Sequence, residues 1–169
     1  MIFIVIIINI ILLILKIMEV WRKMEVTNLQ SISRNHYISG QIEIDDIEGL
    51  ANFGIKLIVN NRPDDEELNQ ISSKLLKDKA KSLGIKFIDI PFASGTLNKQ
   101  KIIDFSDLIK NNNDKSLYFC RSGARSSIIW GLASVIYLGK NMEECMTNIN
   151  NIGYDASMLP NMVDFFKNN

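Results

Sequence analysis

From residue 29 onwards, short apolar runs alternate with longer segments in which apolar residues recur at helical spacing. Strands are expected at residues 29–33, 36–39, 55–60, 86–90 and 116–119, and helices at 47–53, 66–83, 97–110, 126–138, 142–150 and 158–166. The first two strands form a hairpin, whereas the later strands are each separated by a helix. This alternation requires right-handed crossovers, and it predicts a three-layer α/β fold with a mainly parallel sheet flanked by helices.

Polar or turn-forming segments follow three of the predicted strands. These segments are residues 61–64, 91–98 and 120–126. In a parallel sheet, ligands bind at the carboxyl ends of the strands, so the three loops should meet at one rim of the sheet. We therefore expect the functional site at that rim.

Residues 118–126, YFCRSGARS, are the strongest candidate for chemistry. A cysteine ionises more readily at a helix N-terminus, where free N–H groups and the helix dipole favour negative charge, and Cys120 stands between a predicted strand and a helix. The planar guanidinium of Arg125 is suited to binding an anion. We predict Cys120 and Arg125 as catalytic residues. The predicted anion-binding residues of the same loop are Arg121, Ser122, Gly123, Ala124 and Ser126.

Composition limits the other classes of function. The 19 basic and 19 acidic residues cancel and are interspersed, which argues against nucleic-acid binding. Two cysteines and one histidine are too few for a disulfide framework or a zinc site, so we expect no metal and no cofactor. Cysteine usage favours a reducing compartment, and we expect a cytoplasmic protein.

Residues 1–24 form a separate hydrophobic segment, and residues 25–169 are expected to form one domain. A helix over residues 2–18 would be about 25 Å long, marginally enough to span a membrane. Basic residues after it would keep the domain in the cytoplasm. The alternative is a mis-called start, because Met18 and Met24 could each begin a complete domain. Both a tethered and an untethered cytoplasmic protein therefore stay open.

Beyond these patterns, the chain resembles known families. A strand, a cysteine, four residues and an arginine are similar to the active-site loop of rhodanese sulfurtransferases, and with five intervening residues the layout is that of tyrosine and dual-specificity phosphatases. A narrower resemblance, to the phosphatase-like domain family of beta-lactamase-hydrolase-like proteins, covers about residue 25 to the C-terminus. It rests on segments 38–41, 61–64, 90–95, 120–126 and 153–155, with Trp130. It implies a dual-specificity-phosphatase-like fold, and members are also labelled sulfur transferases.

The residues favour sulfur transfer over phosphate hydrolysis. A phosphatase needs an acid to protonate the leaving group, and residues 91–98 contain no carboxylate, while Asp89 lies one residue inside the strand. A persulfide on Cys120, formed from thiosulfate or a persulfide donor and passed to a thiol acceptor, needs no such acid. The first hypothesis is therefore a rhodanese-like sulfurtransferase. The alternatives are a phosphatase that forms a cysteinyl-phosphate from a phosphorylated substrate, and a non-enzymatic anion-binding module.

Arg62 and Asp64 follow the third strand at the same rim. They are predicted to bind substrate, or else to pair with each other across Pro63. Asp64 is the best candidate for the acid that a phosphatase would need. Arg121 either widens the positive field of the loop or is simply solvated, and Tyr154 is expected to be a core residue.

Overall fold

The computed structural model describes residues 10–12, 14 and 29–168 of the chain. The predicted N-terminal anchor or mis-called start therefore lies mostly outside the described residues. Among the described residues, no helix is both long and apolar enough to cross a membrane.

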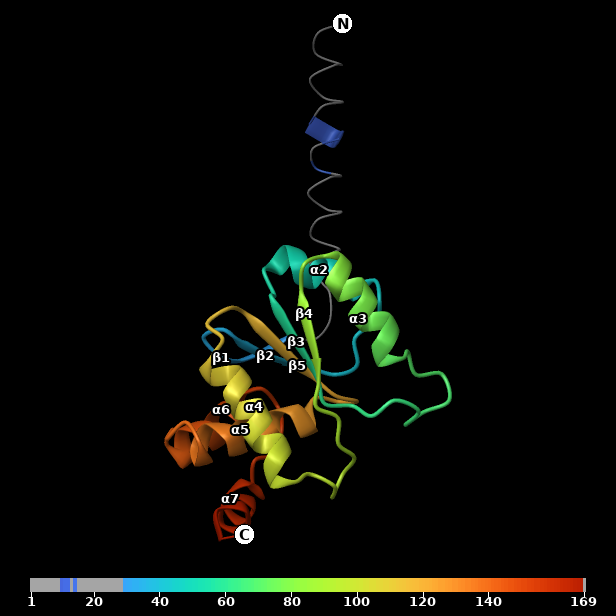
Figure 1. The fold of residues 1–169 in the computed structure, drawn as a ribbon. Helices are drawn as coiled ribbons and strands as arrows, with labels where there is room; N and C mark the ends of the chain where they lie inside the picture. Colours follow the sequence, from blue (N-terminus) through green and yellow to red (C-terminus); the bar gives the residue numbers. More distant parts are fainter. Residues whose placement is uncertain (1–9, 13, 15–28, 169) are drawn as a thin grey trace, which may run out of the picture.

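The predicted three-layer α/β architecture is confirmed, and Figure 1 shows the sheet with helices on both of its faces. The strands are β1 (Gln30–Ser33), β2 (His36–Ser39), β3 (Leu57–Asn60), β4 (Lys86–Asp89) and β5 (Ser116–Phe119). The helices are α2 (Asp46–Phe53), α3 (Ser73–Ser82), α4 (Lys99–Lys110), α5 (Ala124–Ile136), α6 (Met142–Asn151) and α7 (Leu159–Asn168). The strand order is β1-β2-β5-β3-β4, with only the β1–β2 pair antiparallel.

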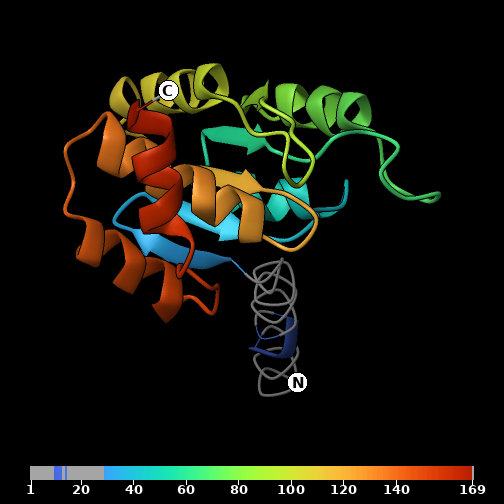
Figure 2. The ribbon, with the colours of Figure 1, turned by 90° about the horizontal axis from the view of Figure 1, so that it is seen from below.

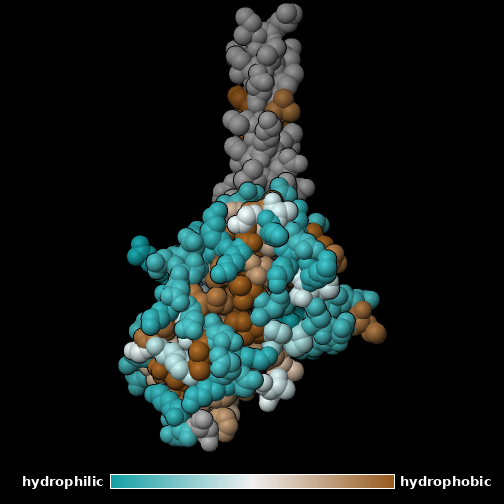
Figure 3. All heavy atoms as spheres, viewed as in Figure 1, coloured by the Kyte–Doolittle hydropathy of each residue, from teal (hydrophilic) through white to brown (hydrophobic). Residues whose placement is uncertain are grey.

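Each face of the sheet has its own apolar core. On one face, α4, α5, α6 and α7 cover a cluster that includes Phe105, Trp130 and Leu132. On the other face, α2 and α3 cover a second cluster around Leu50, Leu76 and neighbouring strand residues. Apolar surface is visible along β4 between α3 and α4 (Figure 3), because β4 lies at the edge of the sheet. The site is therefore carried by a sheet that is packed on both sides.

The order of the strands brings the predicted loops together. Strand β5 pairs in parallel with β2 on one side and β3 on the other, so Cys120 lies between the segments that follow Ser39 and Asn60. The backbone N–H of Gln41 donates to the carbonyl of Arg121 at 3.1 Å, and the N–H of Asn61 donates to Phe119 at 2.8 Å. In Figure 2, α5 begins at this rim and runs back across the sheet, with α7 lying against it.

One predicted helix is much shorter in the structure. Residues 66–83 were expected to be helical, but α3 begins only at Ser73. The preceding loop contains Asp65 in the left-handed conformation (φ 61°), and its Leu68 is fully exposed rather than on an apolar face. The acidic residues of this loop pair with arginines at the rim, which holds the chain away from a helical path.

Candidate active site

Cys120 is fully buried directly after the central strand β5. Its Sγ accepts a hydrogen bond from the backbone N–H of Gly123 at 3.1 Å, and α5 begins at the next residue. Free N–H groups at the start of a helix stabilise negative charge. The position predicted for a thiolate nucleophile is therefore the position that the fold provides.

Gly123 allows the loop to turn tightly below the sulfur. Its φ is 99°, and a Cβ at this position would lie 2.0 Å from the hydroxyl oxygen of Tyr154. That hydroxyl donates to the carbonyl of Ser122 at 2.8 Å. Burial, followed by the charge of Cys120, raises the pKa of Tyr154. Tyr154, predicted as a core residue, is thus half-buried at the site.

Arg125 lies on the first turn of α5, beside Cys120. One terminal nitrogen donates to the carbonyl of Phe92 at 2.8 Å, and the other donates to Glu66 Oε2 at 2.8 Å. Burial lowers the pKa of Arg125, but the hydrogen bond to Glu66 and the charge of Cys120 outweigh burial and raise it overall. Arg125 therefore has the charge and the position to bind an anion at the thiol. In the structure it binds the carboxylate of Glu66.

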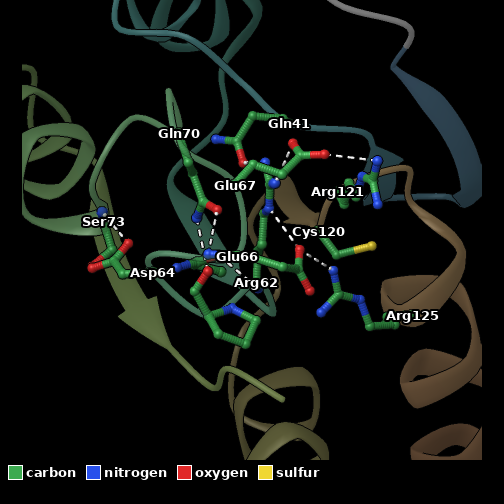
Figure 4. Close-up of polar contacts among 12 residues, drawn as sticks. Gln41, Arg62, Asp64, Glu66, Glu67, Gln70, Ser73, Cys120, Arg121 and Arg125 are labelled. Atoms are coloured by element: carbon green, nitrogen blue, oxygen red, sulfur yellow. Dashed lines mark hydrogen bonds and ion pairs between the residues drawn. The ribbon is translucent and has the colours of Figure 1, made fainter. Parts of the chain in front are cut away.

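A polar network borders the loop on the side of β2 and β3 (Figure 4). Buried Arg62 donates to Glu66 at 2.8 Å, to Glu67 at 2.7 Å and to the side chain of Gln41 at 2.7 Å. Glu66 Oε2 thus bridges Arg62 and Arg125. The hydrogen bond from Arg125 lowers the pKa of Glu66, and Arg62 adds to this in the same direction. The network keeps the carboxylate ionised.

The other predicted anion-binding residues lie around the loop in different ways. Exposed Arg121 pairs with Glu67 Oε1 at 2.7 Å, and the Ser122 hydroxyl lies 3.5 Å from the N–H of Ala124. The buried Ser126 hydroxyl donates to Asn61 at 2.9 Å, so it ties α5 to the segment after β3. Arg121 and Ser122 are thus exposed, whereas Ser126 faces the interior.

Asp64 does not join this cluster. Its carboxylate accepts hydrogen bonds from the backbone N–H and the hydroxyl of Ser73 at the start of α3, at 2.8 and 2.7 Å. Arg62 pairs with Glu66 and Glu67 instead of with Asp64. Since Glu66 and Asp64 are two residues apart, only the path of the loop decides which carboxylate reaches Arg125.

Asp89 points away from the rim. It accepts from Asn60 at 3.1 Å and pairs with Lys77 of α3 at 3.1 Å. The loop at 91–98 contributes the carbonyl of Phe92 to Arg125 but no carboxylate. The carboxylate nearest to the cysteine loop by these contacts therefore comes from the loop after β3.

Gln41, Glu66 and Glu67 were not among the predicted site residues, and Tyr154 was predicted as a core residue instead. Gln41 and Tyr154 lie within segments of the family resemblance, so that signal was available. Glu66 had none, because it was placed inside a predicted helix. Together, the residues form a buried thiol beside a cation, a helix N-terminus and an ionised carboxylate, which can support nucleophilic attack on an anionic group.

The family model "Beta-lactamase hydrolase-like protein, phosphatase-like domain" matches residues 28–136. A beta-lactamase hydrolase-like protein of Xylella fastidiosa (strain Temecula1) is 30% identical over 99 residues. That match covers 59% of this chain and only 23% of the relative. The curated relative is thus several times longer than the segment it shares with this chain.

Solved structures show the same fold. A "putative phosphatase" of Neisseria meningitidis is 27% identical with a TM-score of 0.72, covering 82% of this chain and 98% of that one. A kinase associated phosphatase is 18% identical with a TM-score of 0.64, covering 83% and 92%. At this identity, the second similarity concerns the fold alone. The matching family model is described as a phosphatase-like domain and the Neisseria meningitidis protein as a "putative phosphatase", so the comparisons favour the phosphatase alternative over sulfur transfer.

Proposed function

We propose that this chain, which belongs to the family of beta-lactamase hydrolase-like protein, phosphatase-like domains, is a cysteine-dependent phosphomonoesterase. The observation that carries the proposal is the hydrogen bond from Gly123 to Cys120 Sγ, with Arg125 beside the sulfur. In this proposal, Cys120 is the nucleophile and Arg125 is the anion clamp, both at one helix N-terminus. Those are two of the three groups that phosphate ester hydrolysis needs.

In the first step, the Cys120 thiolate attacks phosphorus and the bond to the leaving oxygen breaks. The loop N–H groups and the Arg125 guanidinium stabilise the charge on the phosphoryl oxygens. A cysteinyl-phosphate forms, and the leaving oxygen takes a proton. In the second step, water attacks phosphorus, the S–P bond breaks, and Cys120 leaves as the thiolate.

Glu66 is the residue that we propose as the proton donor. Its Oε2 lies 2.8 Å from a terminal nitrogen of Arg125. As long as this contact is made, Arg125 lowers the pKa of Glu66. When the guanidinium of Arg125 binds the phosphoryl group, its contact with Glu66 is broken. The phosphoryl group also brings negative charge close to Glu66, and both changes raise the pKa of Glu66. The carboxyl group then protonates the leaving oxygen in the first step and accepts a proton from water in the second.

Comparing leaving groups tests this assignment. 4-Nitrophenolate leaves without a proton, whereas an alkoxide requires one. For Glu66→Gln, we expect kcat to fall roughly 100-fold on an alkyl phosphate and only a few-fold on 4-nitrophenyl phosphate, in line with general acid catalysis. The matched control is Glu67→Gln, from the same loop. Equal losses on both substrates, or equal losses in both variants, would remove Glu66 from the mechanism.

Sulfur transfer is the second candidate, and the absence of a carboxylate at 91–98 favours it. The Cys120 thiolate would attack the outer sulfur of thiosulfate, the S–S bond would break, and sulfite would leave with the electron pair. An acceptor thiolate would then take the outer sulfur from the persulfide and regenerate the Cys120 thiolate. None of these leaving groups needs Glu66.

Intact mass separates the two candidates. After incubation with thiosulfate, a sulfurtransferase gains one sulfur atom, and Cys120→Ala prevents the gain. After rapid quenching with an aryl phosphate, a phosphatase carries a phosphoryl group on Cys120. We expect the second adduct. A persulfide adduct without phosphate ester turnover would overturn the phosphatase proposal.

A further inference from the structure

A groove with a volume of about 520 Å³ opens beside the cysteine loop, on the side away from the polar network. It lies between residues 92–97, the first turns of α5, and α7 with the turn before it. Its apolar lining includes Phe92, Leu97, Ile128, Met158, Met162 and Phe165. Its volume is in the range of pockets that bind small molecules.

Arg125 belongs to both the groove and the anion clamp. Within the part of the chain that the structure describes, it is the only charged residue lining the groove. The same side chain lies beside Cys120 and donates to the carbonyl of Phe92 in the groove wall. The groove is therefore continuous with the place where the phosphate would bind.

The groove leaves apolar side chains in contact with water. Met158 is 57% exposed and Phe165 is 59% exposed, although the residues that follow them in the chain, Leu159 and Phe166, are buried. Methionine side chains adapt to ligands of different shapes. Among the described residues of the lining, Arg125 is the one charged side chain, and the phosphate would occupy it, so the charges of a peptide would find no further ionic partner there.

We propose that this groove binds the apolar part of the substrate, so that the substrate is a phosphomonoester of an apolar alkyl or aryl alcohol. The phosphate lies at the cysteine loop, and the chain or ring lies along Ile128, Met158 and Phe165. This inference rests on the proposed function, since it takes the group bound by Arg125 to be a phosphate ester. It adds the class of alcohol.

Binding of alkyl phosphates to the Cys120→Ser variant tests the groove without turnover. The probes are methyl, propyl and hexyl phosphate, measured by calorimetry at one pH and salt concentration. Each buried methylene is worth up to about 0.8 kcal/mol, so we expect affinity to rise by roughly two- to fourfold per carbon. The rise should stop once the chain fills the groove.

The double variant Met158→Gln, Phe165→Ser removes apolar surface from the groove at two exposed positions. It should flatten the dependence of affinity on chain length while leaving the affinity for methyl phosphate within about twofold. The matched control is Leu75→Ser, an exposed leucine of α3 at 51% exposure on the other face of the sheet. It should keep the full dependence.

The outcomes separate this inference from the proposed function. Affinities that do not change with chain length, or a dependence that survives the double variant, would overturn the groove as the binding site. If the dependence appears but the wild-type protein releases no phosphate from hexyl phosphate, the groove stands and the phosphatase proposal fails. If hexyl phosphate is hydrolysed but affinity does not depend on chain length, the phosphatase proposal stands and the groove fails as the binding site.

Discussion

The two sides of the cysteine loop are built in opposite ways. On the side of β2 and β3, Arg62 and Arg121 are paired with Glu66 and Glu67, so the charges of the protein satisfy each other. On the side of α7, an apolar groove meets solvent, and Arg125 is the one charged side chain among the described residues that line it. One side holds the loop in shape, and the other has room for a ligand. Arg125 touches both, so it is the residue at which the comparison can be tested.

The largest effect is expected from Arg125→Lys. An ammonium group keeps the charge but loses the planar fork that holds a phosphoryl group in two places. We expect kcat/KM for an aryl phosphate to fall about 100- to 1,000-fold, as when a donor to a transition-state oxyanion is removed. Steady-state kinetics measures this, with circular dichroism to check the fold.

The control is Arg121→Lys, the same change four residues earlier. Arg121 is 62% exposed and pairs with Glu67 at the surface, and exposed ion pairs contribute little, so kcat/KM should change less than about threefold. Similar losses in both variants would mean that the polar side, and not only Arg125, binds the substrate.

Gly123→Ala tests the tight turn of the cysteine loop, which lies between the two sides. The new methyl group would clash with Tyr154, and the loop would hold the alanine at a left-handed φ of 99°. We expect a loss of roughly 3 kcal/mol in the free energy of unfolding, combining backbone strain and overpacking. Urea unfolding measures it. Gly95→Ala is the control, because its φ is also positive (79°) but nothing lies within 4 Å of the added carbon.

Arg62→Met tests whether the polar side is structural. Arg62 is only 3% exposed and bonds Glu66, Glu67 and Gln41, so its loss removes the buried cation that the two carboxylates share, although each keeps its pair with Arg125 or Arg121. Since the carboxylates are partly exposed, we expect a loss of about 2 kcal/mol rather than the larger values of fully buried pairs. The control is Lys74→Met, from an exposed pair with Asp78, which should leave the urea midpoint unchanged.

The smallest expected effect is a pH dependence of stability that arises from His36. It sets the pH range in which the two sides of the loop are best compared. Burial, followed by the charge of Lys140, lowers the pKa of His36 from 6.5 to about 4, while Trp130 Nε1 donates to its Nδ1 at 3.0 Å. Between these pH values the unfolded chain binds a proton that the folded protein does not. The contribution of His36 to stability is therefore complete above pH 6.5 and is lost as pH falls towards 4.

From pH 7.5 to pH 5.5, we expect this histidine to cost about 1 kcal/mol of unfolding free energy. His36→Gln should remove that part of the pH dependence, as measured by urea unfolding at both values. An unchanged pH dependence in the variant would assign the loss to other groups. Kinetic comparison of the two sides of the loop is best made above pH 6.5, where His36 does not affect stability.

Local sequence was sufficient for most of the fold and for the centre of the site. The strand pattern before Cys120 and the helical pattern after Arg125 predicted a cysteine at a helix N-terminus, and the structure places it there. The expectation failed at 66–72, where apolar spacing extended a helix that begins only at Ser73. There, pairing with Arg62 and Arg125 outweighs local helix preference.

The sequence by itself determined the alternation of strands and helices, the parallel sheet and the loop from Cys120 to Arg125, because these depend on neighbours in the chain. Only the tertiary structure decided which carboxylate lies on Arg125. Asp64 and Glu66 are both carboxylates of the loop after β3, two residues apart. Asp64 accepts a hydrogen bond from the first residue of α3, whereas Glu66 bridges Arg62 and Arg125. It also decided that α7 forms one wall of the groove beside Arg125. Contacts between segments far apart in the chain leave no local pattern, so packing alone produces them.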